Sequence, residues 1–317
     1  MKTPGASAAS CIPYKKLRRY LLKPAIASVA YLLISHGSRD PRPKEAMTRL
    51  AALVRSRLER SLASSPADNQ QTSQRANRHV VVKDVTADER HQSGRTVLLT
   101  RPRIKPDYTG LSTPRGAIVG TASLEYAPTE LSHQIFEFGQ RLVAAGVEEL
   151  KLLPVFLMAG VHVMEDLPAE IAKAKKLLGD SIKLTLCPHL GGEARMIDIL
   201  NRRIESTPAE ATLLVAHGSR RPRGNRRVKA IGQQLNTEVA YWAIAPDLEE
   251  KVIELMQKGA QRIAILPYFL FAGGITDAIT HRTEELAERF PKIKFRLLPT
   301  LGATDEVADV AVNLLQA

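Results

Sequence analysis

The chain has 317 residues, 44% of them hydrophobic, and carries a formal net charge of +12. This length allows two domains with separate cores, and the lack of any apolar run near the ~20 residues of a membrane span argues against a membrane protein. Two cysteines, Cys11 and Cys187, cannot form a disulfide framework, so we expect a reducing cytoplasm, and the basic excess favours an anionic partner.

The first 27 residues form a basic leader for which we expect disorder. They contain no acidic residue and six basic ones: Lys2, Lys15, Lys16, Arg18, Arg19 and Lys23. A transit peptide is the alternative to a solvated tail, although no cleavage pattern is evident.

In the first half of the chain, strand patterns alternate with helical patterns. The apolar segment Val29–Ser35 predicts a strand that ends at a His-Gly-Ser-Arg sequence, and a helical pattern follows over 44–62. Residues 63–115 are polar and rich in Arg, Gly and Pro, which predicts a largely disordered or loosely packed insertion. Further strands are expected within 118–128, 146–154 and 183–191, and a helix over 167–178 with Asp166 as its N-cap.

The second half repeats this order. LLISHGSR at 32–39 recurs as LLVAHGSR at 213–220, and LLPVFLMAGVH at 152–162 recurs as ILPYFLFAGGI at 265–275. Short apolar strands that alternate with helices predict parallel sheets covered on both faces. We therefore expect an α/β fold of two duplicated three-layer domains, each with a mostly four-stranded parallel sheet flanked by helices. The predicted ranges are 28–205, which contains the insertion, and 210–317.

Three candidate metal ligands follow three different strands of the first half. Ligands bind beyond the carboxyl ends of strands in open parallel sheets, and His36, Glu125 and His162 are expected at that edge. Two imidazoles and a carboxylate suit a divalent ion such as Co²⁺, Fe²⁺, Ni²⁺ or Zn²⁺. The corresponding residues of the second half are His217, Ala243 and Ile275, so we expect chemistry in the first half only.

Each of these residues also has a structural interpretation. His36 can serve the turn, since His217 persists without the other two ligands, and Glu125 can be a plain surface carboxylate. His189 corresponds to Thr300, and nothing else about it points to a ligand.

Three segments resemble the sirohydrochlorin chelatases, the class II metal chelatases of sirohaem and cobalamin biosynthesis. They are SHGSRDPR at 35–42, LEYAP at 124–128 and LLPVFLMAGVHVMEDLPAE at 152–170. The layout resembles the long form of this family, in which a fused tandem replaces a homodimer, so we expect a monomer and a degenerate second repeat. The resemblance implies that His36 and His162 bind the metal and act with Glu125 in catalysis. Substrate contacts are expected from Ser38, Arg39, Arg42 and Gly160.

The implied reaction is the insertion of Co²⁺ or Fe²⁺, with Ni²⁺ as a further candidate, into sirohydrochlorin, a tetrapyrrole with eight carboxylates. The chain has no P-loop sequence, so no ATP requirement is expected. A basic protein attracts such a polyanion, and Arg39, Arg42, Arg220, Arg221 and Arg223 are expected near the cleft.

Alternative functions are a non-catalytic tetrapyrrole or metal carrier and, more remotely, a phosphohydrolase. Histidine phosphatases carry Arg immediately before the histidine of such a turn, whereas this chain has Ser35 and Ala216. A nucleic-acid partner is not expected, because no recognised binding motif is present. The sequence leaves open which metal is used and whether the product feeds sirohaem or cobalamin.

Overall fold

The computed structural model describes residues 28–63, 116–221 and 223–317. The expected basic leader (1–27) and residues 64–115 of the expected insertion lie outside the described residues.

Strands and helices alternate through both halves. A π-helical turn, η3, and a 3₁₀ turn, η4, interrupt the first half. The elements are, in chain order, β1 (Val29–Ser35), α1 (Pro41–Ala63), β2 (Ile118–Ser123), α2 (Leu131–Ala144), β3 (Glu149–Pro154), η3 (His162–Asp166), α3 (Leu167–Leu178), β4 (Lys183–Leu186), η4 (Leu190–Gly192), α4 (Arg195–Glu205), β5 (Ala211–Ala216), α5 (Arg226–Gln234), β6 (Glu238–Tyr241), α6 (Leu248–Gln257), β7 (Arg262–Pro267), α7 (Gly274–Arg289), β8 (Lys294–Leu297) and α8 (Asp305–Gln316).

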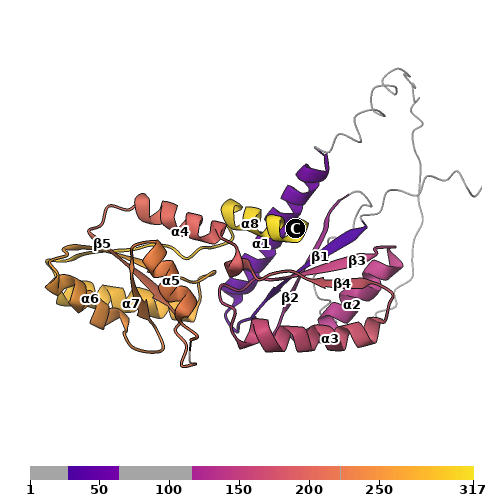
Figure 1. Cartoon of the computed structure of the whole chain (residues 1–317), viewed down its shortest axis with the longest axis horizontal. Coiled ribbons are helices and arrows are strands. Elements are labelled where there is room, and N and C mark those ends of the chain that lie inside the picture. Colours follow the sequence, from indigo (N-terminus) through magenta and orange to yellow (C-terminus); the bar gives the residue numbers. More distant parts are fainter. Residues whose placement is uncertain (1–27, 64–115, 222) are drawn as a thin grey trace, which may run out of the picture.

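The strands form two four-stranded sheets with the same topology. Their orders are β2-β1-β3-β4 and β6-β5-β7-β8, and all neighbouring strands run parallel. Central strands such as β1 and β7 are apolar along nearly their whole length because both faces of each sheet are covered. The predicted fold class is confirmed, and Figure 1 shows the two sheets with their flanking helices.

Three buried clusters hold the layers together. One packs α2 and α3 on the outer face of the first sheet, and another packs α6 and α7 on the outer face of the second. The largest cluster runs through both halves and contains buried residues of α1, α4, α5 and α8.

The last helix of each half packs against the other half. Helix α8 lies along α1 (Figure 1), where Arg57 pairs with Asp305 and Asp309, and Lys151 Nζ of β3 donates to Leu315 O at 2.7 Å. In the opposite direction, Arg203 of α4 donates to the carbonyls of residues 299–301 beyond β8. Each sheet lies within one of the two predicted ranges, but this exchange of helices was not foreseen from sequence.

Matching backbone hydrogen bonds show that the two halves align as the sequence repeat predicts. Glu125 N donates to His36 O at 2.8 Å, and Ala243 N donates to His217 O at 2.9 Å. At the third strand, Val155 N donates to Ile34 O and Tyr268 N donates to Val215 O, both at 2.8 Å.

Among the described residues, no helix combines the length and apolar character that crossing a membrane requires.

Candidate metal centre

The carboxyl ends of β1, β2 and β3 bring His36, Glu125 and His162 together. His36 Nε2 lies 3.2 Å from His162 Nε2 and 3.9 Å from Glu125 Oε2. One ligand atom from each residue lies within 4.8 Å of the other two, and no second group of this kind occurs in the described part of the chain. The three side chains are between 38% and 44% exposed, so an ion held here remains open to a further ligand from outside.

The turn after β1 needs a glycine next to His36. Gly37 has a φ of +93°, and a Cβ at this position would lie 2.0 Å from Glu125 O. Because Gly37 has no side chain, the loops after β1 and β2 can approach closely. This contact sets the distance between His36 and Glu125.

Both imidazoles have a hydrogen-bond acceptor behind them. His162 Nδ1 lies 2.8 Å from Asp166 Oδ2, and His36 Nδ1 lies 3.1 Å from Gly37 O. These acceptors favour the tautomer with the proton on Nδ1, which leaves a lone pair on each Nε2. The two lone pairs then face one another, an arrangement that is stabilised by a cation between them.

The spacing of the two Nε2 atoms suits a shared ion. Two nitrogens that are each about 2.1 Å from one ion, at an angle of about 90–110°, lie about 3.0–3.4 Å apart. The observed separation of 3.2 Å falls in that range. Glu125 can complete the set by a small rotation of its side chain.

Asp166 has a different role from the one expected. No hydrogen bond from its side chain caps α3, because the chain enters α3 from the π-helical turn η3 without a break. Its carboxylate instead accepts from His162, four residues earlier. The sequence predicts Asp166 as the N-cap of α3. The spacing of four residues between His162 and Asp166 is the sequence signal that indicates their contact.

An exposed aromatic ring lies beside the metal centre. The Tyr126 side chain is 56% exposed, and its ring centroid lies 6.4 Å from that of His36. The Arg39 guanidinium lies over the Tyr126 ring at 5.3 Å. Met164, in η3, is also exposed. Tyr126 and Met164 thus offer apolar surface next to the ligands, and sequence reasoning singled out neither.

The four expected substrate contacts have different surroundings. Arg39 remains beside the centre through its contact with Tyr126. Ser38 Oγ accepts from Asp40 N at 3.0 Å and so shapes the turn. Gly160 O accepts from the Val163 and Met164 amides of η3, and a Cβ at Gly160 would meet nothing within 4 Å.

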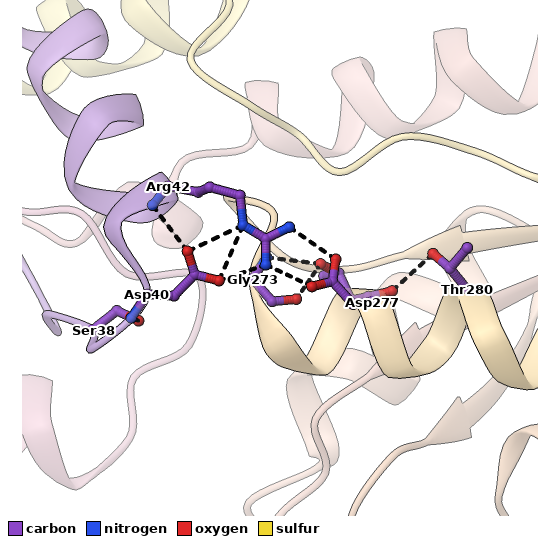
Figure 2. A network of polar contacts seen from close by, with 7 residues as sticks. Ser38, Asp40, Arg42, Gly273, Asp277 and Thr280 are labelled. Atoms are coloured by element: carbon purple, nitrogen blue, oxygen red, sulfur yellow. Dashed lines mark hydrogen bonds and ion pairs between the residues drawn. The ribbon is translucent and has the colours of Figure 1, made fainter.

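The Arg42 guanidinium already has two carboxylate partners, and its expected contact with substrate stays a prediction. It binds Asp40 on its own loop and, through Nη1 at 2.9 Å and Nη2 at 2.5 Å, Asp277 of α7 in the second half (Figure 2). The hydrogen bonds from Arg42 hold the pKa values of Asp40 and Asp277 below their usual range. Arg42 thus bridges the two halves, and a substrate carboxylate would have to displace these partners.

The matching edge of the second sheet has no comparable group. His217 is exposed, Ala243 has no ligand atom, and Ile275 packs against the apolar cluster of its own sheet. The His189 side chain is half-buried, and its pKa is lowered first by this burial and then by the charge of Arg227. It belongs to no group of potential ligands among the described residues.

Comparisons with known proteins place both halves in one family. The family model described as CbiX matches residues 110–207 and again 211–317, so His36 precedes the matched segments. The chain is 25% identical over 201 residues to the sirohydrochlorin cobaltochelatase of Priestia megaterium, covering 58% of this chain and 64% of the relative. It is 26% identical over 195 residues to the sirohydrochlorin ferrochelatase of the same organism, covering 57% and 72%. The chain thus spans just under two thirds of the first relative and somewhat more of the second.

The fold comparison covers more of the chain. The structure of SirB from Bacillus subtilis with Fe³⁺ superposes with a TM-score of 0.60 at 18% identity, over 91% of this chain and 94% of that one. At this identity the superposition shows a shared fold.

Proposed function

Since the chain belongs to the CbiX family, we propose that it is a sirohydrochlorin chelatase that inserts Co²⁺ or Fe²⁺ into the tetrapyrrole without ATP. The observation that carries the proposal is the convergence of the His36 and His162 Nε2 atoms, 3.2 Å apart, with Glu125 beside them. The curated relatives in this family are named for the same reaction with cobalt or iron.

The first task of the site is to hold the ion weakly enough to release it. Two neutral imidazoles leave most positions of a first-row ion to water, which the nitrogens of the macrocycle can replace. Asp166 keeps the His162 ring in one tautomer and orientation. Exposure of all three ligand side chains leaves a face of the ion open to the macrocycle.

The second task is to remove two protons. The free macrocycle carries two pyrrole N–H groups, and the divalent ion replaces both hydrogens, so each turnover releases two protons. The Glu125 carboxylate can accept one of them. The other can pass to an imidazole Nε2 as the ion leaves it, and from there to water.

The apolar surface of Tyr126 and Met164 gives the macrocycle a place to lie. A flat tetrapyrrole over Tyr126 brings its central nitrogens toward the ion and loses little conformational freedom. We propose that the reaction takes place in the first half only. We further propose that the protein is a cytoplasmic monomer whose two halves correspond to the subunits of a dimer.

The test is a metal-insertion assay with the full chain. Metal-free sirohydrochlorin is mixed anaerobically with Co²⁺ or Fe²⁺, without ATP, and the absorption change is followed with and without protein. We expect a rate well above the uncatalysed rate with at least one of the two ions. Tight binding of ion and macrocycle with no gain in rate would instead identify a carrier.

A further inference from the structure

The second half carries an unusually basic loop after its His-Gly-Ser-Arg turn. Between His217 and Glu238 the sequence contains no acidic residue and six basic ones, namely Arg220, Arg221, Arg223, Arg226, Arg227 and Lys229. We call residues 220–221 and 223–229, which include the first turn of α5, the arginine loop. The matching loop of the first half also has basic residues, but it contains two acidic ones, Asp40 and Glu45. The two loops therefore differ in charge although they descend from one repeat.

One substitution explains why most basic residues of the arginine loop have no carboxylate partner among the described residues. Aligning His36 with His217 places Asp40 opposite Arg221 and Arg42 opposite Arg223. In the first half, Asp40 neutralises Arg42, and Asp277 adds a second bond. In the second half the local acid is replaced by an arginine. In the described part of the chain, no carboxylate lies within ion-pair distance of Arg220, Arg223, Arg226 or Lys229.

The arginine loop has a defined shape. The Asn225 side chain accepts from Ser219 N and donates to Ser219 O, each at 2.8 Å, which fixes the turn. Arg223 has a φ of +67°, in the left-handed region. Arg223, Asn225, Arg226 and Lys229 line a surface hollow of about 320 Å³. The cationic groups therefore surround a hollow that is held in place by the loop backbone.

Two contacts join the arginine loop to the first half, which holds the metal centre. Arg221 Nη1 lies 3.5 Å from Glu165 Oε1, and Glu165 belongs to the same π-helical turn as His162. Arg227 Nη2 donates to Gly191 O of η4 at 3.0 Å. The arginine loop thus contacts two turns of the first half, η3 and η4, and η3 also carries His162.

We propose that the arginine loop binds carboxylates at the rim of the tetrapyrrole, through Arg223, Arg226 and Lys229, while the first half holds the ion. This inference rests on the proposed function and assigns a role to the half without metal ligands. Like charges that crowd without counter-charges repel one another, and an anionic ligand relieves that repulsion. Arginine also pairs with carboxylate through two parallel hydrogen bonds, which orients the ligand as well as attracting it.

The test compares two triple variants that remove the same charge. The first is Arg223→Ala/Arg226→Ala/Lys229→Ala. The control is Lys175→Ala/Lys292→Ala/Lys294→Ala, three exposed lysines in the last turn of α3 and near the start of β8, at the sheet edge opposite the ligands. For each, the KM and kcat of metal insertion, the Kd for metal-free sirohydrochlorin and the Kd for Co²⁺ are measured.

We expect the loop variant to raise the KM and the Kd for sirohydrochlorin at least about 10-fold and to weaken their dependence on salt, with the Kd for Co²⁺ unchanged. The control should shift each value less than about 2-fold. Equal shifts in both variants, or unchanged sirohydrochlorin binding in the loop variant, would overturn the inference. Measuring the Kd for sirohydrochlorin requires no turnover. A protein that binds sirohydrochlorin but does not insert metal would refute the proposed chelatase function, and its Kd values would still test the role of the arginine loop.

Discussion

The carboxyl edges of the two sheets have the same backbone arrangement but different side chains. In both, the loop after the second strand donates to the carbonyl of the first histidine, at 2.8 Å and 2.9 Å, and a glycine with positive φ follows that histidine. The first edge carries His36, Glu125 and His162, and the second carries His217, Ala243 and Ile275. The glycine turn is therefore common to both halves, whereas Glu125 and His162 have no counterpart in the second half. This difference leads us to predict that metal binding is confined to the first half.

The largest difference between the halves should appear when the histidines are removed. His36→Ala or His162→Ala should lower the rate of metal insertion at least about 100-fold, because each deletes a ligand of the transferred ion. His217→Ala should stay within about 2-fold of the original rate, since no other ligand lies near it. Anaerobic insertion assays at saturating sirohydrochlorin measure all three. Equal losses for His36→Ala and His217→Ala would show that both halves take part.

Asp166 should matter next, because it acts through His162. Asp166→Ala should weaken Co²⁺ binding or activity about 10–100-fold, the usual effect of removing the partner of a ligating histidine. Asp166→Asn should lie between Ala and the original protein. Co²⁺ titration followed by absorption gives the affinity, and thermal unfolding reports on the fold.

Asp180→Asn, in the exposed turn after α3, serves as the control for Asp166. It should leave the Kd for Co²⁺ unchanged. If the Asp166 variants bind Co²⁺ normally, the carboxylate does not position His162.

Tyr268 is a further difference between the two sheets, at a buried position. It occupies the position of Val155, is 4% exposed, and its hydroxyl has no hydrogen-bond partner among the described residues. Tyr268→Phe should raise the free energy of unfolding by about 1 kcal/mol, because an unsatisfied buried hydroxyl is costly. Urea unfolding at pH 8 measures this, with the exposed Tyr126→Phe as control. A clear loss of stability would mean that the hydroxyl has a partner.

Tyr268→Phe should also change how the free energy of unfolding depends on pH in the alkaline range. Burial raises the pKa of Tyr268 to about 12. The unfolded chain therefore loses its phenolic proton first, so this contribution to stability is intact below about pH 10 and declines as pH rises toward 12. Tyr268→Phe should lack this decline. Parallel curves for the two proteins above pH 10 would contradict the assignment.

The smallest effect is expected from the Arg42–Asp277 bridge between the halves. The pKa of Asp277 is lowered mainly by its hydrogen bonds from Arg42, so the pair stabilises the fold above the unfolded value near 3.8 and loses its effect as pH falls below it. Asp277→Asn should lower Tm by no more than about 1–3 °C at pH 7, since exposed pairs contribute little. The difference should shrink as pH falls below about 3.8. A constant difference across pH would mean that the loss has a non-ionic cause.

Much of the fold and the set of candidate ligands could be predicted from the sequence. Apolar strand patterns such as Val29–Ser35 mark strands covered on both faces, and the repeat gives one topology twice. The convergence of His36, Glu125 and His162 follows from parallel strands that end at one edge. Their roles in catalysis remain predictions.

Other features depend on distances that sequence patterns do not contain. A helical pattern shows that α8 has an apolar face but not that this face covers the other half. The pairing of Arg42 with Asp277 could not be predicted, because the two residues are 235 positions apart. Asp166 was read as a cap because a π-helical turn before α3 has no distinct pattern.

The most direct test of the division between the halves is to locate Co²⁺ in crystals of the full chain by anomalous diffraction. A single ion within about 2.1 Å of both His36 Nε2 and His162 Nε2 is expected, with no ion at His217. An ion bound at His217, or none between the two imidazoles at saturating Co²⁺, would contradict the assignment of metal chemistry to the first half.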